Sequence, residues 1–447
     1  MQQDLFLPKP LPCPAWARRH PGLRAVLTVL GLFVCALVLA LVFQNGSTYA
    51  TGIWDDYSQQ LVFGRMIQMQ QGQASPGGFL GVYTQDWGDS QNRYWYRDNA
   101  ALDPADFQSY THQSGLQGAV MGALNRVCAL WQGDGTARET LLYTVNAVLF
   151  YGLTLAICLA LRRAAGWLPA LGWLAAALLA PGIQTGMKNL YWCLWLWLLP
   201  VLAGVLFCAV VLRRGRAPLW ACLLPGVACL LRCMCGFEFV SAFLILTEAP
   251  LVVCWAAALT RRQPGRPWFF RMVAVGFSAV GGVLAALLIW LCQGAVYFGS
   301  WQESLANILG AAGSRISVTD DTVRQGVTIP GVLYKYFVAD STPVLRLGGL
   351  ELPLGVLLAA TLAAALAAGG ILLALRRRQE LAYLVPVACL WLLAVLAPAS
   401  WLVLSKAHSD AHGHLIPVLF QYAAVPASLA LLGALLTALA RALRPAR

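Results

Sequence analysis

The sequence predicts an all-α polytopic membrane protein, and three observations lead to this fold class. Of the 447 residues, 59% are hydrophobic and only 11% are charged, and the mean hydropathy is +0.65. Apolar windows of about 20 residues, the length that crosses a bilayer as a helix, recur along the chain. Arg residues gather in short clusters at the ends of these windows. This composition is typical of chains that pack their core in lipid.

The apolar windows predict about ten transmembrane helices. They lie at 22–43, 141–161, 168–186, 190–212, 218–235, 239–259, 269–291, 353–375, 381–404 and 415–439. We expect the first window to be retained, because it is too long for the apolar region of a signal peptide and no small-residue cleavage site follows it. The apolar stretch 218–259 is continuous, and we divide it at the sequence CGFEF because two helices keep the later Arg clusters on one side.

The Arg clusters predict the orientation of these helices. They occur at 162–163, 213–216, 261–271, 376–378 and 441–447. If the N-terminus is cytoplasmic, every cluster falls on the cytoplasmic side, and the C-terminus lies there too. The net charge of +12 is thus explained by membrane orientation, so we expect the lipid bilayer, and no nucleic acid, as a partner.

This topology divides the chain into seven segments. They are a cytoplasmic tail (1–21), the first span (22–43), a long extracytoplasmic segment (44–140), spans two to seven (141–291), a second extracytoplasmic segment (292–352), spans eight to ten (353–440) and a cytoplasmic tail (441–447). Apolar residues repeat at helical spacing over 62–69 and over 116–127, which predicts two interfacial helices in the first extracytoplasmic segment. The aromatic and polar sequence between them predicts an ordered lobe.

An acidic pair, Asp55 and Asp56, follows the first predicted span directly. Together with the many spans and the interfacial helices, this pair resembles the layout of the GT-C superfamily of membrane glycosyltransferases. The short sequences GLQG, NLYW, CGFEF and SKAHSDAHGH are also similar to those of uncharacterised bacterial envelope membrane proteins. The resemblance implies an enzyme of the plasma membrane, in a bacterium the inner membrane. Such an enzyme transfers a sugar from a polyprenyl-phosphate donor to an envelope glycan or lipid acceptor at the extracytoplasmic face.

The resemblance also implies a role for the acidic pair. Asp55 or Asp56 is expected to act as the general base that deprotonates an acceptor hydroxyl. Adjacent carboxylates disfavour simultaneous ionisation, which suits one of them to take up a proton. The alternative is that Asp55 caps the helix that follows it. The sequence does not choose between the two carboxylates.

The sequence LSKAHSDAHGHL, between the last two predicted spans, gathers polar residues at the same outer face. Groups that could bind the phosphate of a lipid carrier there are Lys406, His408, His412 and His414, with Lys188 and Arg232 as helpers. Two alternatives remain open. His408, Asp410 and His412 could hold a divalent metal, because imidazole and carboxylate are suitable ligands. The segment could also be a plain solvated turn. No other cofactor is expected.

Three further acidic positions have more than one interpretation. Glu238 could pair with Arg232 or contact sugar hydroxyls. Glu248 lies inside a predicted span, where a carboxylate normally faces a cavity or a partner, although it could also be protonated in place. Asp320 and Asp321 belong to a Gly-containing part of the second extracytoplasmic segment, which is either a loop that closes over substrates or a surface loop.

Functions of other classes are a lipid-linked oligosaccharide flippase, a solute transporter, and a non-catalytic assembly partner of GT-C-like fold. A transporter should carry ionisable residues along several spans, but within the predicted spans they are chiefly Arg232 and Glu248. The sequence also contains no Walker loop, dinucleotide fingerprint or repeat of fixed period. An enzyme that works at the outer face is therefore favoured.

Overall fold

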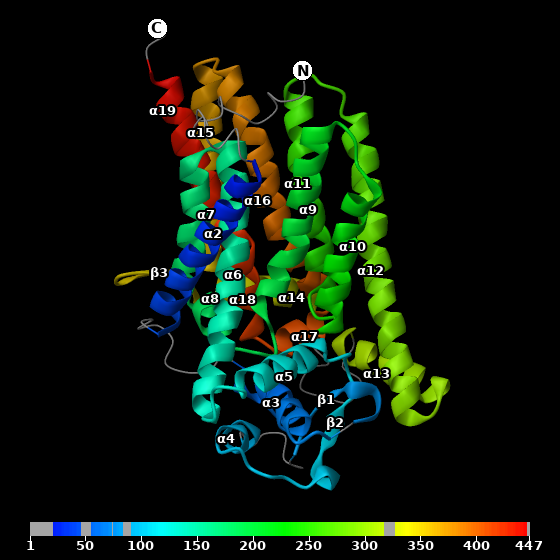
Figure 1. The fold of residues 1–447 in the computed structure, drawn as a ribbon. Helices are drawn as coiled ribbons and strands as arrows, with labels where there is room; N and C mark the ends of the chain where they lie inside the picture. The colour runs from blue at the N-terminus through cyan, green and yellow to red at the C-terminus, as the bar shows by residue number, and fades with distance from the viewer. Residues whose placement is uncertain (1–20, 46–54, 74, 84–90, 317–326, 445–447) are drawn as a thin grey trace.

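The computed structural model describes residues 21–45, 55–73, 75–83, 91–316 and 327–444, which form a bundle of helices with a small lobe at one end (Figure 1). The long helices are α2 (Pro21–Asn45), α6 (Gly135–Ala165), α9 (Leu194–Arg214), α11 (Val240–Thr260), α12 (Arg266–Phe298), α15 (Leu354–Ala374), α16 (Arg378–Leu404) and α19 (Ala424–Ala442). Shorter helices of the bundle are α7 (Trp167–Leu179), α8 (Pro181–Gly186), α10 (Leu219–Met234) and α18 (Leu415–Tyr422). The predicted class, a helical multi-pass membrane protein, is confirmed.

Eight helical segments of the described chain are long and apolar enough to cross a membrane, two fewer than the ten predicted. The windows at 168–186 and 218–235 do contain apolar helices, but α7 and α10 are only 13 and 16 residues long. α7 stops because Pro181 disfavours helical backbone in the residue before it. α10 begins only after Pro218. Pro181 therefore makes α7 shorter than its predicted window, whereas α10 agrees with the window 218–235 to within one residue at each end.

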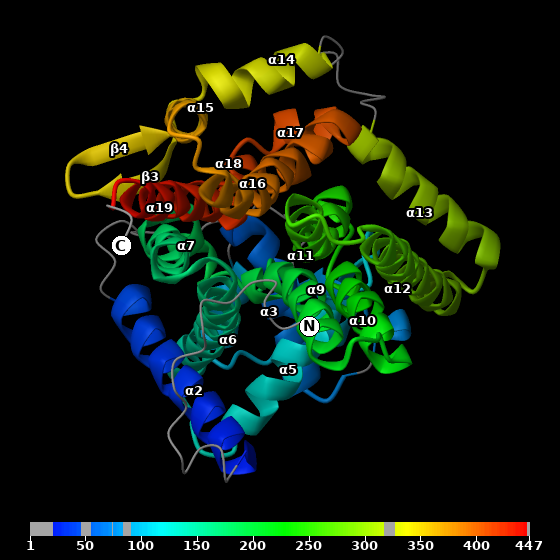
Figure 2. The same cartoon turned by 90° about the horizontal axis from the view of Figure 1, so that it is seen from above.

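The break within the long apolar stretch lies at CGFEF, where the sequence placed a boundary. α10 ends at Met234 and α11 begins at Val240. Between them Gly236 and Phe239 adopt positive φ angles of 144° and 65°, which turn the chain back. Seen from above, α10 lies between α9 and α12, whereas α2 lies at the edge of the bundle against α6 (Figure 2).

The lobe comprises the part of residues 44–134 that the structure describes. Its elements are α3 (Asp56–Gln70), β1 (Leu80–Val82), α4 (Gln91–Arg97), β2 (Gln108–Tyr110) and α5 (Leu116–Cys128), with 3-10 turns at Pro76–Gly78 and Pro104–Asp106. β1 pairs antiparallel with β2, Leu80 opposite Tyr110. The two helices predicted for this segment are α3 and α5.

α3 is the central helix of the lobe and packs against α4, α5 and β1. It buries polar side chains, Gln59, Gln60 and Gln68, as well as apolar ones. Its close approach to β1 depends on Gly64, because a Cβ atom there would lie 2.1 Å from the carbonyl oxygen of Gly81.

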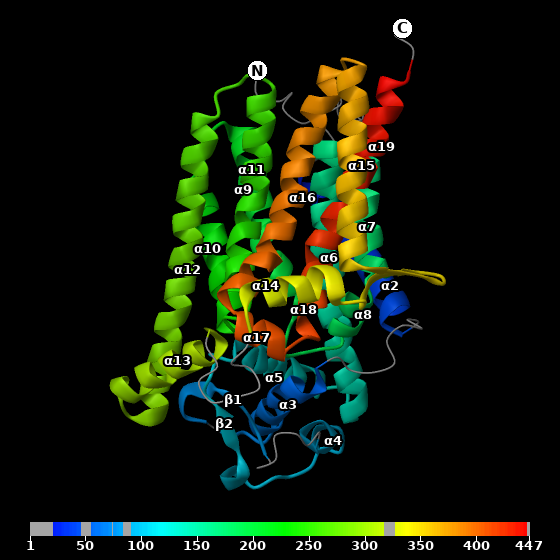
Figure 3. The same cartoon turned by 180° about the vertical axis from the view of Figure 1, so that it is seen from behind.

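The described part of residues 299–353 contains three helical elements and two short strands. They are α13 (Trp301–Ile316), α14 (Ile329–Tyr334), a π-helical turn (Lys335–Ala339), β3 (Pro343–Leu347) and β4 (Leu350–Pro353). Both α13 and α14 contact α17 (Lys406–Ala411), which is the polar turn itself. Asp320 and Asp321 lie outside the described residues. The Arg-rich connections α11–α12 and α15–α16 lie at the end of the bundle opposite the lobe (Figure 3).

Candidate functional site

The two carboxylates of the acidic pair lie in different surroundings. Asp55 is the N-cap of α3, in the left-handed region at φ 52° and ψ 52°, and its side chain accepts a hydrogen bond of 3.4 Å from the Ser58 backbone N–H. The capping role that the sequence left open is therefore present. The Asp55 side chain is only 8% exposed, whereas that of Asp56 is 28% exposed.

Asp55 brings together three segments that are far apart in the chain. The indole Nε1–H of Trp192 donates to Asp55 Oδ2 at 2.6 Å. The side-chain amide of Asn189 donates to the Asp55 backbone oxygen at 3.1 Å. On the other carboxylate oxygen, Asp55 Oδ1 lies 3.9 Å from Nε2 of His414. The predicted base and the predicted polar turn thus form one site.

The sequence NLYW builds the wall of this site behind Asp55. The Asn189 side chain is fully buried, and its Oδ1 accepts the backbone N–H groups of Tyr191 and Trp192 at 2.9 and 3.0 Å. The backbone N–H of Leu190 donates to Oε1 of the buried Gln59 at 2.7 Å. These bonds fix the turn against α3, so the position of Trp192 relative to Asp55 follows from the folded backbone.

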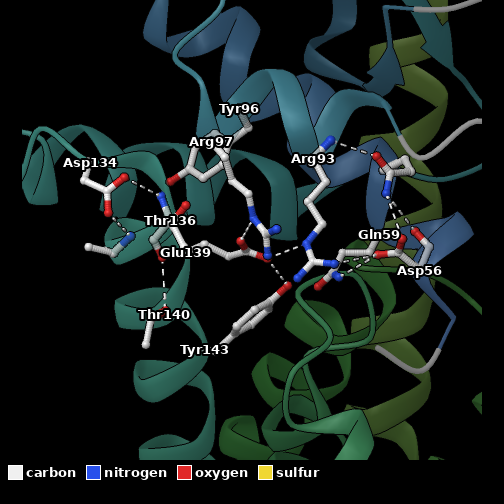
Figure 4. Close-up of polar contacts among 12 residues, drawn as sticks. Asp56, Gln59, Arg93, Tyr96, Arg97, Asp134, Thr136, Glu139, Thr140 and Tyr143 are labelled. Carbon is white, nitrogen blue, oxygen red and sulfur yellow. Dashed lines mark hydrogen bonds and ion pairs between the residues drawn. The ribbon is translucent and has the colours of Figure 1, made fainter. Parts of the chain in front are cut away.

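Asp56 belongs to a cluster of ionic contacts and hydrogen bonds (Figure 4). Its Oδ1 lies 3.9 Å from Arg93 NH1, and its Oδ2 accepts a hydrogen bond of 3.3 Å from Gln60 Nε2. Arg93 Nε in turn donates to Glu139 at 2.6 Å. Asp56 is therefore part of the scaffold of the lobe.

Glu139 is the centre of that cluster, and sequence reasoning did not single it out. Its side chain is 2% exposed. It accepts hydrogen bonds from Arg93 Nε at 2.6 Å, Arg97 Nε at 2.5 Å and the Tyr143 hydroxyl at 2.7 Å. The cluster joins α4 to the start of α6, so it holds the lobe on the bundle (Figure 4).

Three imidazoles follow one another toward Asp55: His408 lies in α17, His412 is the C-cap of α17, and His414 is the N-cap of α18. The ring centroids of His408 and His412 are 4.5 Å apart, and those of His412 and His414 are 5.9 Å apart. His408 also packs edge-on against Trp401, at 5.7 Å. His408 is half-buried, whereas His412 and His414 are exposed, so the three imidazoles extend from the protein interior to the solvent.

Lys335 and Tyr336 hold α17 in place. Lys335 Nζ lies 2.8 Å from Asp410 Oδ1, and the Tyr336 hydroxyl donates to the Ser409 backbone oxygen at 2.5 Å. Ala407 and Ser409 are buried. The segment is therefore more ordered than a plain solvated turn. Asp410 forms an ion pair with Lys335. Within the described ranges, no three His, Cys, Asp or Glu residues are grouped so that they could hold a metal ion.

Two predicted phosphate ligands, Lys188 and Lys406, lie next to residues of the site along the chain. Lys188 directly precedes Asn189, and Lys406 opens α17. Both side chains are half-buried. Neither ammonium group forms a hydrogen bond or an ion pair with another described residue.

Arg232 and Glu238 shape the turn between α10 and α11. The buried Arg232 guanidinium donates to the backbone oxygens of Gly236 and Glu238 at 3.0 and 3.2 Å and lies 4.4 Å from the centre of the Phe243 ring. Glu238 is buried beside Gln113. Glu248, in α11, has both carboxylate oxygens buried with no hydrogen-bond partner among the described residues.

Comparison with known proteins gave structural neighbours only. No family model and no curated protein matches the sequence. The chain is similar to the oligosaccharyltransferase of Archaeoglobus fulgidus in its apo form, with 13% identity and a TM-score of 0.42 over 91% of this chain and 50% of that one. It is also similar to AglB of the same organism in complex with an inhibitory peptide and a dolichol-phosphate, with 15% identity and a TM-score of 0.43 over 97% and 53%. The chain spans about half the length of these oligosaccharyltransferases, and a likeness of this degree assigns no activity to it.

Proposed function

We propose that this chain is a membrane glycosyltransferase with Asp55 as its general base. The observation that carries the proposal is the convergence of Asp55, Trp192 and His414 from three distant segments. The Asp55 carboxylate is shielded from bulk water, yet one of its oxygens faces an exposed imidazole. A general base needs this combination of fixed geometry and access to a substrate.

The proposed reaction needs one proton transfer and one displacement. Asp55 takes the proton of an acceptor hydroxyl while the hydroxyl oxygen attacks the anomeric carbon of the donor sugar. The bond between that carbon and the phosphate oxygen breaks, and the bonding electrons leave with the polyprenyl phosphate. The acceptor is an envelope glycan or a lipid.

The leaving phosphate needs cationic partners beside the base. Lys188 and Lys406 are cations with no partner in the described chain, and His408, His412 and His414 add hydrogen-bonding groups next to Asp55. We assign the phosphate to this group. Arg232 and Glu238 support it by holding the α10–α11 turn. The site then works at the extracytoplasmic face of a plasma membrane, in a bacterium the inner membrane.

The structure provides a matched pair of variants to test this proposal. Cells that lack the chain are complemented with wild type, Asp55→Asn or Asp56→Asn at equal expression, and their glycans and lipid-linked sugars are analysed by mass spectrometry. The null strain and Asp55→Asn should lose one glycan modification and accumulate one polyprenyl-phosphate sugar. Asp56→Asn should restore most of the modification, because Asp56 contacts the scaffold. Wild-type glycans in the Asp55→Asn cells would refute the proposal.

A further inference from the structure

The two oxygens of the Asp55 carboxylate are not equivalent. Oδ2 accepts the indole N–H of Trp192 at 2.6 Å, within the range of strong charge-assisted hydrogen bonds. Among the described residues, Oδ1 accepts only the long 3.4 Å bond from the Ser58 backbone N–H, and it faces His414 Nε2 across 3.9 Å. Trp192 therefore occupies one oxygen and leaves the other directed toward the polar turn.

The donor itself has little freedom to move. Trp192 is 4% exposed, and its ring packs against those of Tyr191, Trp197 and Phe239 at centroid distances of 5.1, 5.9 and 5.8 Å. Its backbone N–H is bound to the Asn189 side chain. A donor that is fixed at both backbone and ring imposes one rotation on the carboxylate that it binds.

We infer that Trp192 is a positioning residue, which selects Oδ1 of Asp55 as the oxygen that accepts the proton. This inference rests on the proposed function. The acceptor hydroxyl then lies between Asp55 Oδ1 and His414 Nε2, since 3.9 Å is too long for a direct hydrogen bond and is a span that one oxygen atom can bridge. Without the indole N–H, the carboxylate can rotate and present either oxygen.

The test separates this hydrogen bond from the shape of the indole. Benzothienylalanine, in which sulfur replaces the indole N–H, is incorporated at position 192 of the full-length protein. The same analogue at position 391 is the matched control, because Trp391 also donates its indole N–H, to Ser428 at 2.9 Å between α16 and α19. Turnover and KM are measured with the polyprenyl-linked sugar fraction extracted from null cells, and thermal unfolding is recorded for each protein.

The analogue at position 192 should lower kcat by about tenfold to a hundredfold, the effect of one hydrogen bond to a charged group. KM should stay within about twofold, because the lost bond orients the base and does not hold substrate. The control should keep wild-type turnover. Trp192→Phe, which keeps an aromatic ring, serves if the analogue protein does not fold and should lower kcat likewise.

The possible failures are distinguishable. Wild-type kcat in the Trp192 variants, or a raised KM with unchanged kcat, overturns the positioning role while an inactive Asp55→Asn protein still supports the proposed function. An active Asp55→Asn protein in the same assay refutes the proposed function itself, and the inference falls with it.

Discussion

Replacing Glu139 with Gln should lower the free energy of unfolding by more than the loss of a surface ion pair does. The carboxylate accepts three hydrogen bonds of 2.5 to 2.7 Å, and its side chain is 2% exposed. Arg93 and Arg97 donate to different oxygens of this carboxylate, so the amide keeps an acceptor for one guanidinium group and turns its NH2 group toward the other. Removing one partner of a buried ion pair typically costs about 3 to 5 kcal/mol. Arg93 and Arg97 remain 19% and 26% exposed, so we expect the lower end, about 3 kcal/mol.

The measurement is equilibrium unfolding of the purified protein in mixed detergent micelles, with Glu351→Gln as the matched control. Glu351 pairs with Arg346 at 2.8 Å, but its side chain is 56% exposed, so its loss should change the free energy of unfolding by less than about 1 kcal/mol. If the two variants are equally stable, the Glu139 cluster does not hold the lobe on the bundle.

Two further predictions concern the lobe. Gly64→Ala should destabilise the protein by about 1 to 3 kcal/mol, because the new Cβ would overlap the Gly81 carbonyl oxygen. Gly310→Ala is the control, because this glycine is also inside a helix but has nothing within 4 Å of an added Cβ, and it should stabilise the protein by up to about 1 kcal/mol. If both variants change the free energy of unfolding in the same direction, the packing of α3 on β1 is contradicted. Burial raises the pKa of Tyr96 to about 12, so the unfolded state loses its phenol proton first and stability falls as pH rises above about 10. Between pH 9 and pH 11, the free energy of unfolding of Tyr96→Phe should therefore fall by about 1 kcal/mol less than that of wild type. Equal decreases in the two proteins would show that folding does not raise the pKa of Tyr96.

The helical bundle was predictable because the length of an apolar window is a local property of the sequence. The extent of one predicted helix was wrong, because Pro181 ends α7 at Leu179 and not at residue 186. The burial of Gln59 and Gln60 was not predictable, because their partners come from other parts of the chain.

The site was predicted in separate parts. Asp55 and His414 were both candidates, but only the fold places them 3.9 Å apart. The choice between Asp55 and Asp56 depends on side-chain direction, which differs because Asp55 is an N-cap with left-handed backbone angles and Asp56 is the first helical residue. Trp192 was visible in the sequence NLYW, yet nothing local indicates that its indole meets a carboxylate. Glu139 was missed because its burial depends on two arginines from α4.

The most direct test of the central claim is the transfer rate of purified Asp55→Asn against that of purified Asp56→Asn. Both proteins receive the polyprenyl-linked sugar fraction from null cells, and the product is quantified by mass spectrometry. General-base catalysis contributes about a hundredfold to ten-thousandfold, so Asp55→Asn should be slower than wild type by at least about a hundredfold while Asp56→Asn stays within about tenfold. Equal rates for the two variants, or a fast Asp55→Asn enzyme, would contradict the assignment of Asp55 as the base.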